Sequence, residues 1–294
     1  MRRFLCRTLL GLATLGTLAA GPVAFAEGAA RTVTVRTAAG AKSYRVGKQL
    51  GSGGWGTVYE GHGPHGESVA IKLSSREDPE GNFDHEVRMM EKHGGKGTRV
   101  PSAIGVGHVD GSPHERALVM ERVGTSTVLS AFDSTPVAPR PVGEALHIAG
   151  QVLDTLSAIH AKGDRHNDAY PGNWRIDDDG KVFLIDLQRV GPISDRLRKG
   201  HPWVTYHAPE VVNGSSLAGS VASDVFTVAV GIVAMLTGKR DPTPADLSSP
   251  EIPDWLRPVL AKGMEPDPLK RYATPAQFKS ALQLAHSAAR AHGQ

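Results

Sequence analysis

The sequence predicts an α+β fold with two lobes, of which the first is rich in β-strands and holds one helix and the second is rich in helices. Three observations lead to this class. Residues 44–73 contain short stretches that alternate apolar and polar side chains, as half-buried strands do. Residues 82–94 then have apolar side chains at helical spacing and end in a glycine. From Val142 onward the apolar spacing is helical, which places the boundary between the lobes near Gly124.

The first lobe is expected to contain strands on both sides of its helix. The segment 32–36 alternates β-branched and basic residues and is interpreted as an edge strand or a tail. The next strand, 44–50, runs into a glycine-rich stretch that leads to a second strand. Three further strands are predicted at residues 67–73, 103–109 and 116–123.

The second lobe is expected to be built from long helices. Apolar residues recur every three or four positions in the stretches 142–163, 221–238, 253–264 and 275–292. The predicted domain therefore covers residues 44–286, with the first lobe at 44–123 and the second at 124–286. A short extension at 27–43 would precede it and a tail at 287–294 would follow it.

The composition of the 294-residue chain is that of an ordinary globular protein, with 40% hydrophobic and 21% charged residues. Its net charge of +3 comes from the first 26 residues, which hold three arginines and no acid. The remainder has 33 − 3 = 30 basic residues against 30 acidic ones. The two signs are well mixed, so we expect no basic face and no nucleic-acid partner.

The first 26 residues have the layout of a secretory signal peptide. Three arginines precede an uncharged, mostly apolar run, and the segment ends in the small-x-small sequence AFA. Cleavage after Ala26 would give a secreted or periplasmic protein. The alternative is an uncleaved membrane anchor, because the run is just long enough to span a bilayer, although its glycines and Pro22 make it a poor anchor. Cys6, the only cysteine, lies in this leader, so the mature protein would have no disulfide.

A glycine-rich stretch lies between the first two strands of the predicted domain. Gly51, Gly53 and Gly56 fit the pattern G-x-G-x-x-G, in which glycine lets the backbone approach a phosphate and point N–H groups at it. A glycine hairpin turn fits the pattern equally well. Lys72 follows on a strand and Glu86 on the predicted helix. A phosphate-binding lysine needs such a carboxylate to hold it, whereas a solvated surface glutamate is the ordinary alternative.

The stretch GDRHNDAYPGNW, residues 163–174, has the composition of a loop. Asp168 and Asn173 lie five residues apart, with a proline and a glycine between them. Turn formation alone accounts for these residue types. The alternative is a catalytic loop that holds an acid and a metal ligand, and other segments of the chain must decide between the two.

Several ordered segments together resemble the eukaryotic-like Ser/Thr protein kinases of bacteria. They cover Tyr44 to Ala285 and are, in order, GSGGWGTVYEG, VAIK, DHEVRMM, HNDAYPGN, LIDLQ, YHAPE, SDVFTVAVGIVAMLTG and DPLKRYAT. Turn propensity does not explain so many motifs in one order. The resemblance implies a protein-kinase-like bilobal fold and ATP-dependent phosphoryl transfer to Ser or Thr hydroxyls of a protein substrate.

The resemblance also implies the roles of the polar residues. Lys72 would bind the α and β phosphates of ATP and pair with Glu86. Asp168 would accept or orient the proton of the attacking hydroxyl. Asn173 and Asp186 would hold Mg²⁺.

A second group of residues would surround the rest of the nucleotide. It includes the loop glycines, two residues that cover the adenine, a gatekeeper and two hinge residues. These are Gly51, Gly53, Gly56, Val58, Ala70, Met120, Glu121 and Val123.

Three more residues would have structural roles. Glu210 and Arg271 resemble the buried ion pair that ties down the substrate lobe of these kinases. Asp224 resembles the helix residue that braces the catalytic loop.

The chain departs from the family pattern at several positions. Asn167 replaces the arginine before the catalytic aspartate, which makes the chain a variant without the Arg-Asp pair. Tyr170 replaces the lysine that would steady the γ-phosphate. Leu187 and Gln188 replace a Phe-Gly pair, and Arg175 stands where an apolar residue usually supports the adenine. These changes affect rate and acceptor identity more than nucleotide binding.

The segment between Asp186 and Glu210 is expected to work without phosphorylation. In kinases with the arginine, that side chain binds a phosphate on this segment and orders it. The neutral Asn167 places no such demand. We therefore expect packing of the segment itself, through Pro202 and Trp203, to hold it in place.

Two other functions fit some of the motifs. Small-molecule and lipopolysaccharide-core sugar kinases share the fold and have similar loop and metal-site sequences, but typically lack the APE and SDVFTVAVG segments present here. A pseudokinase that binds nucleotide as a scaffold fits less well, because the polar site residues are retained. ATP is scarce outside the cytoplasm, so an exported enzyme would act where ATP is available, or else the leader is an anchor or a misassigned start.

Overall fold

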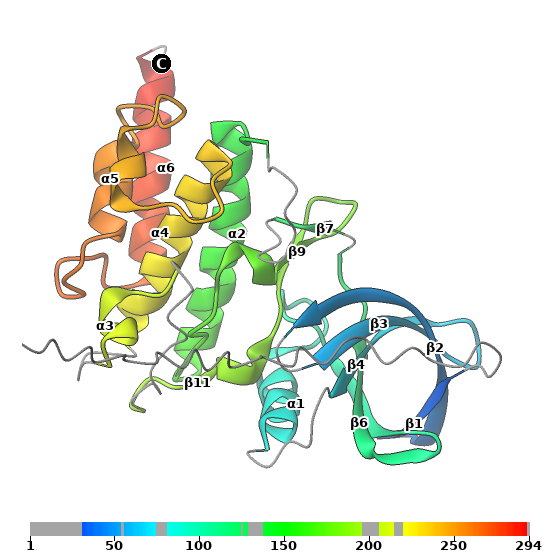
Figure 1. Cartoon of the computed structure of the whole chain (residues 1–294). Coiled ribbons are helices and arrows are strands. Elements are labelled where there is room, and N and C mark those ends of the chain that lie inside the picture. Colours follow the sequence, from blue (N-terminus) through cyan, green and yellow to red (C-terminus); the bar gives the residue numbers. More distant parts are fainter. Residues whose placement is uncertain are drawn as a thin grey trace, which may run out of the picture. The chain divides into compact units, whose positions relative to one another are not determined.

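The computed structural model of the protein describes residues 31–53, 56–74, 81–124, 126–128, 138–195, 206–214 and 220–292 (Figure 1). These residues belong to one compact unit. The leader and the expected packing of Pro202 and Trp203 lie outside the described residues and stay predictions. Within the described ranges, no helix is both long enough and apolar enough to cross a membrane.

Six strands of the first lobe form a closed antiparallel barrel, the ring of arrows in Figure 1. Around the barrel they are β1 (Thr32–Thr37), β2 (Gly40–Gly53), β3 (Gly56–His62), β4 (Ser68–Ser74), β6 (Ser112–Glu121) and β5 (Ala103–Val109). Alternate side chains of these strands, such as Val33, Ile71 and Val119, fill the barrel with an apolar core.

The barrel is closed by β1, so the interpretation of residues 32–36 as an edge strand or a tail is wrong. β1 pairs with β2 on one side and with β5 on the other, and Val33 and Val35 are buried inside. Glycines on β5 make the close approach possible, because a Cβ on Gly107 would overlap the carbonyl oxygen of Thr34. The strand structure therefore begins before residue 44, within the predicted extension.

Helix α1 (Asn82–His93) forms where the helical spacing predicts it. It follows Gly81, whose φ of 67° suits glycine, and ends at Gly94. Its Phe83 and Met90 are buried in the apolar core of the second lobe. The helix therefore connects the barrel to the helical lobe.

The second lobe is organised around α4 (Val221–Thr237), every residue of which from Ala222 to Leu236 is buried. A helix that is buried on all sides needs partners on every side. It packs against α2 (Val142–Ala161), α5 (Arg257–Gly263) and α6 (Pro275–Ala291). The start of α5 is four residues later than predicted, since residues 254–256 form turns.

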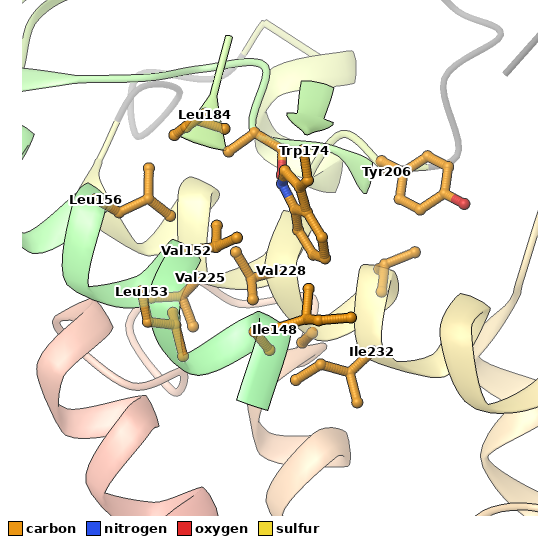
Figure 2. Close-up of a cluster of buried hydrophobic side chains, with 14 of the residues drawn as sticks. Ile148, Val152, Leu153, Leu156, Trp174, Leu184, Tyr206, Val225, Val228 and Ile232 are labelled. Carbon is orange, nitrogen blue, oxygen red and sulfur yellow. The ribbon is translucent and has the colours of Figure 1, made fainter. Parts of the chain in front are cut away.

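Trp174 links the catalytic-loop region to this helical core. In Figure 2 its indole lies among side chains of α2 and α4, including Val152 and Val228. The ring is fully buried, and its Nε1 donates to the carbonyl of Ala169 at 3.0 Å. A Cβ on Gly231 of α4 would lie only 2.7 Å from the indole. The loop is thus anchored by packing rather than exposed.

The remaining elements of the second lobe are short. They are β7 (Ser126–Thr127), β8 (Asp164–Arg165), η1 (Pro171–Asn173), β9 (Trp174–Ile176), β10 (Val182–Leu184), η2 (Leu187–Arg189), β11 (Gly191–Pro192), α3 (Pro209–Val212) and η3 (Pro244–Ser248). β10, β9 and β7 form one small sheet, and β11 pairs with β8. These pairings bring the predicted catalytic loop next to the segment that follows Asp186.

Barrel closure by β1 can be tested with a glycine substitution. We expect Gly107→Ala to lower the free energy of unfolding by about 2 kcal/mol, because the added methyl group has no room beside β1. Gly143→Ala, in the first turn of α2 with open space around it, should be neutral or slightly stabilising. Urea unfolding of both variants measures the difference, and equal stability would argue against the β1–β5 contact.

Candidate active site

A buried ion pair joins the barrel to α1. Lys72 on β4 donates to both carboxylate oxygens of Glu86 on α1, at 3.0 Å and 2.8 Å, and its Nζ lies 3.6 Å from Asp186 Oδ1. Burial would lower the pKa of Lys72, but the carboxylates of Asp186 and Glu86 outweigh it and raise this pKa. Burial raises the pKa of Glu86, which Lys72 opposes. Glu86 therefore needs its cation to stay ionised.

The strand register places Lys72 on the same face of the sheet as three residues predicted to lie near adenine. Val58 lies opposite Lys72 on β3, and Ala70 lies two residues away and opposite Met120 on β6. Side chains alternate along a strand, so these four share one face, whereas Ile71 points into the barrel. The pairing thus groups residues that the sequence separates by as many as 62 positions.

The predicted hinge begins where β6 ends. The backbone N–H of Glu121 donates to Ser102 O at 2.9 Å, and the Glu121 carboxylate accepts from the Ser102 N–H at 3.1 Å. Val123 follows outside the strand. Gly124 has a φ of 59°, and a Cβ there would lie 2.8 Å from the carbonyl of Ile176. The hinge therefore passes close to β9 of the second lobe.

The glycine-rich stretch forms the hairpin between β2 and β3, with Gly53 opposite Gly56. A Cβ on Gly56 would overlap the carbonyl oxygen of Leu73 on β4. Strand packing therefore requires this glycine whatever its role toward phosphate. Gly51 faces the second lobe, because a Cβ there would lie 3.8 Å from a terminal nitrogen of Arg175.

The predicted catalytic loop is buried, which excludes a simple surface turn. Asn173 is 5% exposed, and its Nδ2 donates to the backbone oxygen of Asp168 at 2.8 Å and to Oδ2 of the same residue at 3.3 Å. The amide oxygen of Asn173 is the atom left for a cation. Burial, aided by repulsion from Asp186, raises the pKa of Asp168 to about 7. That value suits a group that accepts a proton near neutral pH.

Asp224 on α4 braces this loop, as the resemblance implies. Its two carboxylate oxygens accept from the backbone N–H groups of His166 and Asn167, at 2.9 Å and 2.8 Å. One oxygen also contacts His160 Nε2 on α2 at 2.8 Å. Burial would raise the pKa of Asp224, but these hydrogen bonds and the charges of His160 and His166 lower it. A charged acceptor is thus held beneath the loop.

The residues at the predicted metal site fit Mg²⁺. Asp186 Oδ1 is buried and accepts no hydrogen bond from any described residue. The N–H of Ile185 donates to Asn173 O at 3.0 Å, so the two candidate ligands lie on neighbouring backbone segments. Across the described part of the chain, no three His, Cys, Asp or Glu side chains form a metal-binding group. Mg²⁺ needs only one or two such ligands, because phosphate and water oxygens complete its shell.

The position of the Tyr170 ring requires a glycine at residue 172. Its ring lies against Gly172, where a Cβ would overlap the aromatic carbons. The ring centroid is 5.7 Å from that of Tyr206, whose hydroxyl donates to Arg240 O at 2.7 Å. The loss of the expected lysine is therefore accompanied by an aromatic contact to the segment before α3.

Arg175 on β9 approaches the glycine-rich hairpin at Gly51. It is half-buried, and its side chain forms no hydrogen bond or ion pair with another described residue. Burial lowers the pKa of Arg175, which Tyr170 opposes. The guanidinium therefore has unused donors close to Gly51, at the end of β2. The family pattern has an apolar residue in place of Arg175, which would support the adenine.

Glu210 and Arg271 form the predicted buried ion pair. Two parallel hydrogen bonds of 2.6 Å and 2.7 Å join the guanidinium to the carboxylate. Arg271 also donates to Ala222 O at 3.2 Å. This bidentate pair connects α3 to α4 and to the segment before α6.

Three residues without a role assigned from the sequence also lie around the site. The side chain of Gln188 helps to lower the pKa of Glu86, against the larger effect of burial. His85 Nε2 lies 2.6 Å from Val190 O, and Arg165 is buried within the loop. A role for Arg165 could not be predicted from the sequence, because a single polar residue gives no periodic pattern.

The comparisons with known proteins agree with the geometry. Residues 44–252 match the protein kinase domain family. The chain is 28% identical over 273 residues to the serine/threonine-protein kinase Pkn1 of Myxococcus xanthus, covering 83% of this chain and 38% of that protein. It is 25% identical over 260 residues to the probable serine/threonine-protein kinase PknB of Lactococcus lactis, covering 79% and 40%. A plant relative, CBL-interacting protein kinase 4 of Oryza sativa, is 27% identical over 253 residues, covering 78% and 55%. The chain thus spans 38–55% of the length of these relatives.

Proposed function

The chain belongs to the protein kinase family, and on that premise we propose that it transfers the γ-phosphoryl group of ATP to Ser or Thr hydroxyls of proteins. The observation that carries the proposal is the assembled set of charges at the site. Lys72 contacts both Glu86 and Asp186, while Asn173 contacts Asp168. An incomplete set would favour a scaffold that only binds nucleotide.

Each polar residue has a task in this reaction. Glu86 holds the Lys72 ammonium in place, where it pairs with phosphate oxygens of ATP. Asp186 and Asn173 would hold Mg²⁺, which when bound neutralises charge on the phosphates. Asp168 orients the acceptor hydroxyl and takes its proton as the bond to phosphorus forms.

A small-molecule or sugar kinase is the second candidate, because Tyr170 replaces the lysine that usually steadies the γ-phosphate. The bidentate pair of Glu210 and Arg271 favours a protein acceptor, since the resemblance assigns it to the substrate lobe. A panel of protein and sugar acceptors, assayed with and without Mg²⁺, distinguishes the two enzymes from each other.

The kinase proposal predicts that Lys72→Met abolishes phosphoryl transfer, with a loss of about 100-fold or more in kcat. The exposed lysine of β2 provides a matched control, and Lys48→Met should retain full activity. Radiolabel transfer from ATP to a generic protein substrate, and autophosphorylation, are the measurements. Wild-type transfer by a folded Lys72→Met protein would contradict the proposal.

Folding must be controlled separately, because Lys72→Met leaves Glu86 buried without its cation. The double variant Lys72→Met with Glu86→Gln removes both charges. We expect it to unfold at a higher temperature than the single variant and to be equally inactive. A double variant that is more stable but equally inactive would show that the activity is lost through the missing Lys72 ammonium and not through unfolding.

We also propose that Arg175 contributes positive charge at the phosphate end of the nucleotide, which Tyr170 cannot supply. Arg175→Leu should weaken binding of magnesium–ATP by about tenfold and leave adenosine binding nearly unchanged. Arg45→Leu, at an exposed position of β2, is the control. Calorimetric titration with both ligands tests the idea, and an equal loss for both would point to adenine support instead.

Export of the mature protein, starting at Glu27, remains a proposal that rests on the leader sequence alone. Mass-spectrometric sequencing of the N-terminus in each cell fraction should find Glu27 first in the exported fraction. An intact leader in the membrane fraction would favour the anchor, and an intact chain confined to the cytoplasm would contradict export.

A further inference from the structure

Arg165 is a buried cation whose donors are used within the loop region. It lies on β8, two residues before Asn167, and is 1% exposed. Its Nε donates to Asn167 Oδ1 at 2.7 Å and one terminal nitrogen donates to Ile193 O at 2.6 Å. The other terminal nitrogen donates to the carbonyl oxygen of Asp195. One guanidinium thus joins the catalytic loop to the segment that follows Asp186.

Asn167 extends the same set of contacts. It has a φ of 67°, a left-handed conformation that asparagine adopts more readily than most residues. Its Nδ2 donates to Arg189 O at 2.7 Å, while its Oδ1 accepts from Arg165. Both ends of the amide are therefore engaged, which an arginine at this position could not reproduce, because arginine has no acceptor.

Backbone contacts support the same arrangement from two sides. Gly191 of β11 pairs with Arg165 of β8, and Ile193 N–H donates to Gly163 O at 2.9 Å. From α1, His85 Nε2 lies 2.6 Å from Val190 O. Residues 189–195, here called the 189–195 segment, are thus attached both to the catalytic loop and to the helix that carries Glu86.

We propose that Arg165 is a positioning residue that holds the 189–195 segment in the active arrangement without a phosphate. It would act in place of the arginine that Asn167 replaces. The proposal rests on the proposed kinase function and specifies how the segment of that enzyme is ordered. Its partners in the 189–195 segment are backbone carbonyls, which are permanent features of the chain, whereas a phosphate tether depends on modification.

The charges around Arg165 are consistent with this role. Burial disfavours the guanidinium charge, and the carboxylates of Asp224 and Asp195 oppose that effect. Carbonyl oxygens on Ile193 and Asp195 accept from its two terminal nitrogens. Burial still lowers the pKa of Arg165, so these carboxylates offset it only in part. The guanidinium nevertheless has acceptors on the chain itself, without an added phosphate.

The test compares Arg165→Gln and Arg165→Lys with Arg290→Gln, an exposed arginine of α6. Arg165→Gln should lower kcat by about tenfold or more while KM for ATP changes by less than about threefold, because Lys72 and the hinge are untouched. Arg165→Lys keeps the charge but not the planar set of donors, so its kcat should lie between those of Arg165→Gln and the wild type. Arg290→Gln should match the wild type.

A second measurement does not depend on activity. Trypsin cleavage at the basic positions between 189 and 199, located by mass spectrometry, should be at least about tenfold faster in Arg165→Gln than in Arg290→Gln under native conditions. If the wild type transfers no phosphoryl group, the kinase proposal fails while this result still supports or contradicts the Arg165 contacts. If a folded Arg165→Gln protein is cleaved at the wild-type rate and has the wild-type kcat, the inference is overturned. If Arg165→Gln does not fold, the same two measurements are made on Arg165→Lys.

Ser194 and Thr205 are the serine and the threonine in the sequence between Asp186 and Glu210. Phosphatase treatment, Ser194→Ala and Thr205→Ala therefore complete the experiment. Each should leave the initial rate within about threefold of the untreated wild type, because carbonyl groups and not a phosphate hold the 189–195 segment. A drop of more than about tenfold, some 1.4 kcal/mol in barrier, after phosphatase treatment or in Ser194→Ala would show a phosphate switch and overturn the inference. A similar drop in Thr205→Ala counts against the inference only if phosphatase treatment also lowers the rate.

Discussion

The buried ion pair between Lys72 and Glu86 is the contact on which the rest of the site depends. It joins a barrel strand to α1, and Asp186 brings a second carboxylate to the same ammonium. Burying charges is unfavourable, so such a pair fixes geometry more than it adds stability. Stability comes from the apolar cores inside the barrel and around α4. Because Phe83 and Met90 of α1 belong to the second core, packing in both lobes sets where the two charges meet.

A second buried carboxylate organises the catalytic loop in the same way. Asp224 lies on a helix that is buried along nearly its whole length, so its position is fixed by packing on every side. A carboxylate can only accept hydrogen bonds, and the donors here are the backbone of His166 and Asn167 and the ring of His160. The loop backbone is thus held by hydrogen bonds to Asp224, and the side chain of Asp168 takes no part in them.

The departures from the family pattern come with neighbours that fit them. The ring of Tyr170 needs the space left by Gly172, and the amide of Asn167 accepts from Arg165. Gln188, in place of a glycine, helps to lower the pKa of the carboxyl in the buried ion pair. Substitutions that each form a specific contact are consistent with a site that is assembled, and they distinguish this chain from one in which the motifs have simply decayed.

The sequence by itself determined the fold class, most of the strands and helices and the polar residues of the site, because these depend on local spacing and on ordered motifs. Lys72 and Asp224 were named from the ordered motifs and the resemblance that they carry. It did not determine that the strand at residues 32–37 closes the barrel, since its pairing with β5 joins segments about 70 residues apart in the chain. Nor did it assign partners to Arg165 and His85, because a lone polar side chain carries no periodic signal. Only the tertiary structure decides which carbonyl groups lie within hydrogen-bonding distance of such a residue, as those groups come from distant segments brought together by packing.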